Sequence, residues 1–212
     1  MQTTVREFYD KFADIYQKNR NLYDMTKVID SFSGYLDTKK GELLDLGCGT
    51  GEPFGRWFID HGWSVTGVDF SKQMLELASK NVPEMKMICA DMLQVEFDSN
   101  HFDAITATYS LFHVPSKNHA ALFDKFYHWL CPKGSALFTY ATKEYTGSKD
   151  FSGYIEFMGE ELYYSHKSPE ELYAMLEKTG FRIESRDYRD IGGETFLWVT
   201  VSKPAGELRY NK

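Results

Sequence analysis

Residues 43–52 read Leu43-Leu44-Asp45-Leu46-Gly47-Cys48-Gly49-Thr50-Gly51-Glu52, a short apolar run followed by a glycine-rich turn. Glycine can take backbone angles that a side chain forbids, so this turn can be tight and can let a ligand approach the main chain. Pro53 comes next and suits the first turn of a helix, where an amide hydrogen has no partner within the helix. The stretch therefore predicts a strand, a turn and a helix whose first N–H groups face the turn.

Outward from this turn, short apolar runs alternate with amphipathic segments. Helical spacing over residues 5–35 predicts two helices before the first strand. Strands are then predicted near residues 43–46, 64–68, 85–89, 102–107 and 136–140, and helices near 53–61, 72–80 and 116–130. A helix near 169–179 and strands near 181–188 and 195–201 complete the pattern.

Alternation of strand and helix is typical of a parallel sheet with helices on both faces. The last two strands are joined by the short loop Asp190-Ile191-Gly192-Gly193, which is too short for a crossover helix and predicts an antiparallel pair. With 212 residues the chain has room for one α/β domain. We expect a Rossmann-like, seven-stranded, mostly parallel sheet with an antiparallel last strand and an N-terminal helical cap.

The composition of the chain disfavours several classes of function. The net charge of -7 and the lack of a Lys/Arg cluster disfavour a nucleic-acid partner. No apolar run is long enough for a membrane helix, and the first residues do not resemble a secretory signal, so we expect a cytoplasmic protein without a membrane partner. Cys48, Cys89 and Cys131 have no zinc-ligand spacing, and we expect no metal and three reduced, buried thiols.

The spacing of the glycines separates two classes of cofactor. Dinucleotide enzymes use G-x-G-x-x-G, whereas this chain has G-x-G-x-G over Gly47, Gly49 and Gly51. Asp45 lies two positions ahead, where an acid suits a ligand with an ammonium group better than one with a pyrophosphate. A nicotinamide-dependent oxidoreductase is therefore disfavoured, although it stays an alternative.

From about Leu43 to Tyr140 the chain resembles the class I S-adenosylmethionine-dependent methyltransferases that act on small molecules. The resemblance implies S-adenosylmethionine as cofactor and S-adenosylhomocysteine as product. It assigns Asp45, Gly47, Cys48, Gly49 and Gly51 to the methionine end of the cofactor.

Two further acids match the family pattern. Asp69, at the end of the second strand, would hold both ribose hydroxyls, and Phe70 with Met74 would flank the adenine. Asp91 would accept from the adenine amino group, while the backbone amide of Met92 reaches a ring nitrogen. Capping of the following helix is an alternative role for either acid taken singly.

The segment after the fourth strand, residues 107–115, lines the substrate mouth in similar proteins. Its His113 and Tyr109 are the candidate catalytic residues, as proton acceptors from the nucleophile, and Tyr109 is also a candidate cofactor contact. A structural role for His113 stays open. Tyr9 and Tyr16 occur in Tyr9-Asp10-Lys11-Phe12-Ala13-Asp14-Ile15-Tyr16, which resembles the opening of related methyltransferases. The resemblance implies a helix that caps the pocket, with Tyr9 and Tyr16 as cofactor contacts; aromatic packing of an amphipathic helix is the alternative.

Residues 143–168 are rich in aromatic side chains and read as a long loop, which we interpret as a lid or substrate wall, with packing or a homodimer contact as alternatives. The expected divisions are a helical cap (1–38), a cofactor-binding core (41–140), an aromatic lid (141–168), and a C-terminal helix with the antiparallel strands (169–203). The expected reaction is methyl transfer to an O, N, S or C atom of a small molecule by in-line displacement. A non-catalytic protein that binds the same cofactor and a macromolecular methyltransferase are the remaining alternatives.

Overall fold

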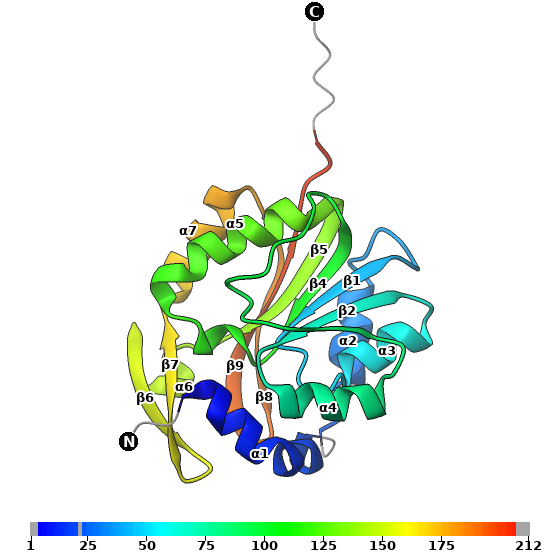
Figure 1. The fold of residues 1–212 in the computed structure, drawn as a ribbon. Helices are drawn as coiled ribbons and strands as arrows, with labels where there is room; N and C mark the ends of the chain where they lie inside the picture. Colours follow the sequence, from blue (N-terminus) through cyan, green and yellow to red (C-terminus); the bar gives the residue numbers. More distant parts are fainter. Residues whose placement is uncertain (1–3, 21–22, 207–212) are drawn as a thin grey trace, which may run out of the picture.

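The alternating pattern folds into a seven-stranded central sheet (Figure 1). The structure is a computed structural model that describes residues 4–20 and 23–206. In spatial order the strands are β3 (Lys86–Cys89), β2 (Ser64–Asp69), β1 (Glu42–Leu46), β4 (Phe102–Ala107), β5 (Leu130–Tyr140), β9 (Glu194–Ser202) and β8 (Arg182–Ile191).

The strand pairings confirm the predicted fold class. β3, β2, β1, β4 and β5 are parallel to their neighbours, and β9 runs antiparallel to both β5 and β8. The strand order runs one way from β1 to β3 and the other way from β4 onward. In such sheets ligands bind beyond the carboxyl ends of the strands at this point of reversal.

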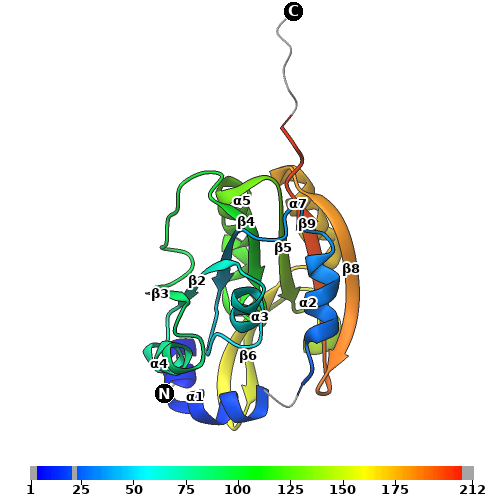
Figure 2. The same ribbon diagram turned by 90° about the vertical axis from the view of Figure 1, so that its right-hand side faces the viewer.

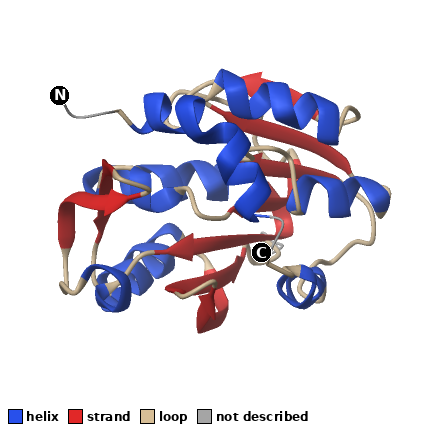
Figure 3. Ribbon diagram, turned by 90° about the horizontal axis from the view of Figure 1, so that it is seen from below, coloured by secondary structure: helices blue, strands red, loops and turns tan. Residues whose placement is uncertain are grey.

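Helices cover both faces of the sheet (Figures 2 and 3). They are α1 (Val5–Arg20), α2 (Thr26–Ser33), α3 (Phe54–Asp60), α4 (Lys72–Asn81), α5 (His119–Trp129), α6 (Lys143–Thr146) and α7 (Pro169–Thr179), with short 3-10 turns at Leu111–His113 and Ser116–Asn118. Phe126 of α5 and Leu176 of α7 fill the core on one face, and Phe32 of α2 and Phe58 of α3 fill it on the other. Each of these buried side chains stabilises the fold by roughly 1.5–3 kcal/mol.

Residues 143–168 differ from the predicted loop. They form α6 and an antiparallel hairpin of β6 (Phe151–Phe157) and β7 (Glu160–His166). Met158 and Gly159 at the turn have φ values of 53° and 79°, the left-handed geometry that matches the twist of a hairpin. The alternation of partly buried and exposed residues along β6 has the period of a strand, a signal that the density of aromatic residues obscured.

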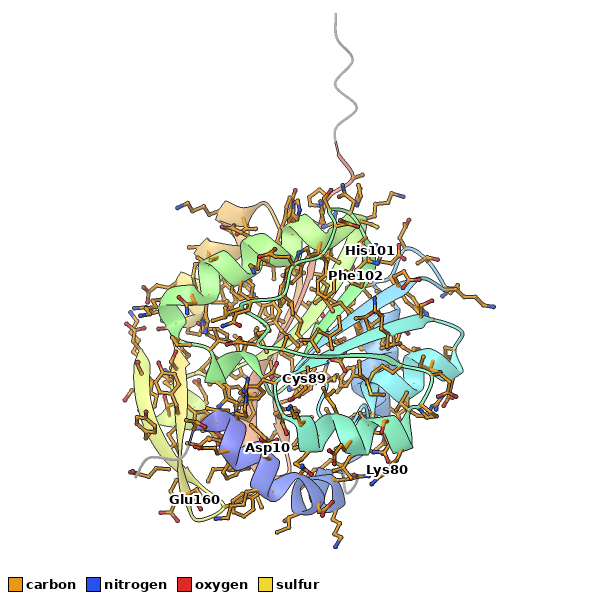
Figure 4. The ribbon with its side chains drawn as sticks, viewed as in Figure 1. Asp10, Lys80, Cys89, His101, Phe102 and Glu160 are labelled. Atoms are coloured by element: carbon orange, nitrogen blue, oxygen red, sulfur yellow. The ribbon has the colours of Figure 1, made fainter. Side chains whose placement is uncertain are left out.

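Helix α1 crosses below the sheet and lies between the hairpin and α4 (Figure 1). Phe8 is fully buried, and its ring packs against those of Phe12 and Phe157. Lys11 Nζ contacts a carboxylate oxygen of Glu160 at 2.6 Å (Figure 4). Because this ion pair is largely exposed, the apolar contacts contribute most to holding α1 in place.

The three cysteines are free, as expected, but only Cys48 is buried. Cys89 is exposed and Cys131 is partly exposed, so the prediction that all three are buried was wrong. Cys89 ends β3, the edge strand of the sheet, where one side of the strand has no neighbour to cover it (Figure 4). No helix among the described residues has the length and apolar character needed to span a membrane.

Candidate active site

A cavity of about 760 Å³, measured with its open mouth included, lies beyond the carboxyl ends of β1, β2, β3 and β4. The lining residues are Tyr9, Gly47, Gly49, Val68, Asp69, Phe70, Met74, Ala90, Asp91, Met92, Leu93, Thr108, Tyr109, Ser110, His113, Val114 and Pro115. Four loops and helix α1, far apart in sequence, therefore meet at one site.

The glycine loop after β1 has the backbone geometry that the sequence predicts. Gly47, Gly49 and Gly51 have φ values of 75°, 54° and 79°, a region that other residues rarely adopt. The Val68 carbonyl oxygen accepts from the N–H of Gly47 at 2.7 Å, which ties the loop to the end of β2. A Cβ atom on Gly47 would lie 2.5 Å from Cβ of Ser110, so both the angle and the space require glycine here.

Asp69 connects the glycine loop to the start of α4. The residue is 6% exposed; one carboxylate oxygen accepts from the N–H of Gly49 at 2.9 Å and the other from the N–H of Ser71 at 2.8 Å. A carboxylate oxygen can accept more than one hydrogen bond, so these contacts are compatible with contacts to a ligand hydroxyl. Phe70 and Met74 line the same part of the cavity.

Asp91 lies at the end of the next strand and also organises its own loop. One carboxylate oxygen accepts from the N–H of Leu93 at 2.9 Å, a local turn that leaves the second oxygen for other partners. Met92 lies beside the glycine loop, with its terminal methyl 3.7 Å from the Cβ position of Gly47. The structural and ligand-binding roles of Asp91 are thus compatible.

Several predicted site residues lie behind the glycine loop instead of lining the cavity. Asp45 is 4% exposed and accepts from Oγ1 of Thr106 at 2.8 Å. Cys48 packs in the core near Met85, and Gly51 packs close to Met85 as well.

Tyr9 lines the cavity from α1, whereas the Tyr16 side chain lies outside the described part of the structure. Asp10, next to Tyr9, accepts from Oγ of Ser71 at 2.6 Å and from the N–H of Gln73 at 3.3 Å (Figure 4). Helix α1 is therefore fastened to the first turn of α4, close to Asp69.

His113 lines the cavity opposite α1 and is held at both ring nitrogens. Nδ1 lies 2.8 Å from the Tyr163 carbonyl oxygen, which can only accept, so Nδ1 carries the proton. Nε2 then accepts from the hydroxyl of Tyr9 at 2.9 Å. Burial lowers the pKa of His113 to about 4, and the bond to Tyr163 opposes this shift only in part. His113 is therefore neutral at pH 7.

Tyr109 also lines the cavity, in a conformation uncommon for a residue with a side chain. Its φ is 55°, and its N–H donates to Oγ1 of Thr139 at 2.6 Å, which stabilises that conformation. The ring packs edge-on against Phe196 and Trp198, with centroid distances of 5.5 and 5.6 Å.

Three apolar lining residues were absent from the sequence-based site: Val68, Ala90 and Leu93. Each is adjacent to a predicted residue or one position removed from it, and the carboxyl ends of the parallel strands bring them together. Among the described residues, no group of three or more His, Cys, Asp or Glu side chains is placed to hold a metal ion.

A methyltransferase domain family matches residues 16–186. The chain is 34% identical over 140 residues to phosphoethanolamine N-methyltransferase 3 of Arabidopsis thaliana, covering 62% of this chain and 28% of the relative. It is 30% identical over 190 residues to phosphoethanolamine N-methyltransferase of Triticum aestivum, covering 85% of this chain and 35% of the relative. The chain thus spans about a third of the length of these curated relatives.

Among solved structures, the [4+2]-cyclase SpnF superimposes with a TM-score of 0.72 at 17% identity, covering 97% of this chain and 98% of that one. At this level of identity the likeness concerns the fold. A common fold does not decide the reaction, which has to be argued from the residues of the site.

Proposed function

Because this chain belongs to the methyltransferase domain family, we propose that it binds S-adenosylmethionine and transfers its methyl group to a small molecule. The observation that carries the proposal is the pairing of Asp69 with the glycine loop, which places a buried carboxylate and backbone without side chains on one wall of the cavity. We further propose a cytosolic location, since three free thiols suit a reducing compartment.

The lining residues fit the cofactor by their chemistry. Asp69 offers lone pairs to the two ribose hydroxyls, and Phe70 and Met74 offer apolar surface to the adenine. Asp91 and the backbone of Met92 would bind the polar edge of the base, and Gly47 and Gly49 would leave room for the methionine end. When bound, S-adenosylmethionine supplies a methyl group on a sulfonium, already activated for transfer to a nucleophile.

Tyr9 and His113 would orient the nucleophile. The Tyr9 hydroxyl donates its proton to His113, and a phenol oxygen that donates can also accept a hydrogen bond. An acceptor O–H or N–H that donates to this oxygen has its own lone pair fixed in direction. The rate of in-line methyl transfer depends strongly on holding the nucleophile in such a fixed direction.

In this arrangement His113 is a hydrogen-bond acceptor for Tyr9 and not a general base. With its pKa lowered to about 4, holding a proton at pH 7 costs about 4 kcal/mol, at about 1.4 kcal/mol per pKa unit. That cost favours a positioning role, with the proton of the nucleophile leaving to water. Tyr109 would shape the mouth of the same chamber.

The charged residues that line the cavity indicate which kind of methyl acceptor it can hold. Its described lining contains two carboxylates, Asp69 and Asp91, and no Lys or Arg. Arg6 lies above the Phe70 ring at the cofactor end, 5.9 Å from its centroid. We therefore propose an acceptor without a phosphate group, unlike the acceptor named in the plant relatives, and without nucleic acid as a partner.

Titration calorimetry with S-adenosylhomocysteine tests the cofactor assignment. We expect Asp69→Ala to weaken binding by about 100-fold or more, because two charge-assisted hydrogen bonds contribute roughly 1.5–3 kcal/mol each. Asp98→Ala, at an exposed acid, is the matched control and should bind like the wild type. Unchanged affinity in Asp69→Ala would refute the ribose assignment.

A screen of small-molecule acceptors, read out by release of S-adenosylhomocysteine, tests catalysis. Turnover with any small acceptor supports methyl transfer. Tight cofactor binding without turnover across O, N, S and C nucleophiles favours a protein that uses the bound cofactor for another purpose.

A further inference from the structure

A second polar group lies next to Tyr9 and outside the cavity lining described above. It consists of Tyr145 on α6, Tyr164 on β7 and Glu194 at the start of β9. The Tyr145 hydroxyl lies 3.4 Å from that of Tyr164 and donates to a carboxylate oxygen of Glu194 at 3.3 Å. Three elements that are separate in sequence thus bring two phenols and a carboxylate together.

This group borders the chamber at Tyr9 and Tyr109. Tyr164 belongs to a buried apolar cluster against which Tyr9, Tyr109 and Tyr145 pack. Burial is the main cause that raises the pKa of the Tyr164 hydroxyl. The ring of His113 also packs against that of Tyr164, with 4.8 Å between centroids.

Glu194 points to the same face of the sheet as the rings around Tyr109. Residues two apart in a strand share a face, so Glu194 lies on the side of Phe196 and Trp198, against whose rings the Tyr109 ring packs. Phe196 in turn lies against Tyr145, with a centroid distance of 4.5 Å. The carboxylate is therefore at the rim of an aromatic cluster that begins at the cavity.

The charge of Glu194 has no cationic partner among the described residues: Tyr145 is its hydrogen-bond donor, and none of the ion pairs there includes it. Burial raises the pKa of Glu194, and the hydrogen bond from Tyr145 lowers it by less. The hydrogen bond from Tyr145 therefore replaces only part of the solvation that the carboxylate loses. The side chain is partly exposed, which leaves it accessible to a ligand. A cation would stabilise the charged form here.

Resting on the proposed methyl transfer, we propose that the acceptor carries an ammonium group and that Glu194 binds it, with the partly exposed Tyr145 beside it. The carboxylate supplies the charge, and the electron-rich ring of Tyr145 adds a weaker attraction for a cation. Tyr164 and Tyr145 orient the carboxylate. Glu194 is thus a specificity-determining residue and lies apart from the groups that hold the cofactor.

The test compares binding of matched probes to the protein saturated with S-adenosylhomocysteine. The pairs are n-butylamine with n-butanol, benzylamine with benzyl alcohol, and phenethylamine with 2-phenylethanol, measured by calorimetry at pH 7. For at least one pair we expect the wild type to bind the amine about tenfold more tightly than the alcohol, and Glu194→Gln to reduce this preference to under about twofold.

Glu156→Gln is the control, because Glu156 is an exposed acid on the neighbouring hairpin and its loss changes the net charge equally. It should keep the wild-type preference. Absence of an amine preference in every wild-type pair would overturn the proposal without any variant, and so would a preference that survives in Glu194→Gln. Binding of S-adenosylhomocysteine alone is measured first: its failure refutes the proposed function, whereas failure of the amine arm alone refutes only the role of Glu194.

Discussion

The hydroxyl of Tyr9 lies 2.9 Å from Nε2 of His113, although 104 positions separate the two residues in the chain. The bond joins α1 to the loop after β4 across one end of the cavity. Because Nδ1 of His113 is held by the Tyr163 carbonyl, the orientation of the Tyr9 hydroxyl is fixed by the hairpin as well. One phenol therefore depends on three separate parts of the fold.

Tyr9→Phe tests the positioning role of this hydroxyl. The ring and its packing remain, but the nucleophile loses its hydrogen-bond acceptor, so we expect kcat to fall by about 10- to 100-fold. Affinity for S-adenosylhomocysteine should change by less than about threefold, since we propose that Tyr9 contacts the methyl acceptor and not the cofactor. The measurements are steady-state kinetics with an acceptor found in the screen, and calorimetry.

Tyr154→Phe is the matched control for Tyr9→Phe, because Tyr154 is an exposed tyrosine on the hairpin. It should retain the kcat of the wild type. A Tyr9→Phe enzyme with wild-type kcat would show that the hydroxyl does not contact the nucleophile.

Gly47→Ala tests the close approach in the cofactor loop. The substitution forces alanine to a φ of 75° and places its Cβ 2.5 Å from that of Ser110. We expect a loss of about 2–4 kcal/mol in unfolding free energy, of which the backbone angle accounts for about 1 kcal/mol. Urea denaturation measures the loss.

Gly159→Ala separates the angle from the clash, because Gly159 has a φ of 79° and no atom within 4 Å of its Cβ position. It should lose only about 1 kcal/mol. The double variant Gly47→Ala/Ser110→Gly should regain the part of the unfolding free energy that the contact with Ser110 removes. Equal losses at the two glycines would mean that contact with Ser110 is unimportant.

Asp10→Asn tests whether α1 is fastened to α4 through Ser71. The Ser71 hydroxyl donates to Asp10 and also accepts from the N–H of Met74 at 3.1 Å, capping α4. Asparagine weakens the first bond and spares the cap, so hydrogen exchange should speed up in α1 and stay unchanged in α4. Ser71→Ala removes both bonds and should also destabilise α4, by about 1 kcal/mol. Unchanged exchange in α1 of Asp10→Asn would contradict the attachment.

Acid should destabilise the protein through two histidines. Burial lowers the pKa values of His113 and His119 to about 4, below their unfolded value of about 6.5. Between these values the unfolded chain binds more protons, so the stabilisation is complete above pH 6.5 and is lost as the pH falls toward 4. Each histidine should contribute a slope of up to about 1.4 kcal/mol per pH unit.

Urea denaturation between pH 7 and pH 4.5 measures this slope. His113→Asn should reduce it by up to about 1.4 kcal/mol per pH unit, and His128→Asn, at an exposed position on α5, should leave it unchanged. His166, whose pKa burial also lowers, contributes to the slope that remains. An imidazole of His113 that titrates near 6.5 in NMR spectra would contradict the burial effect.

The sequence predicted that Gly47, Gly49 and Asp69 lie together, and these residues line one cavity. Gly47 and Gly49 are in the turn after β1 and Asp69 ends β2, and parallel strands bring their carboxyl ends to one edge of the sheet. The periodicity of apolar residues predicted the strands and helices of the core. The short loop at Gly192 predicted the antiparallel pair of β8 and β9. The same signals missed the hairpin, where aromatic residues on both faces of the strands hid the alternation.

The sequence by itself determined the sheet, its glycine turn and the acids at the ends of its strands, because each depends on residues a few positions apart. Only the tertiary structure decided that Tyr9 meets His113 and that Tyr145 meets Glu194, because no periodic pattern links residues so far apart in the chain. It also decided that Asp45 lies behind the loop and that Cys89 is exposed, since burial depends on what the rest of the chain places over a residue.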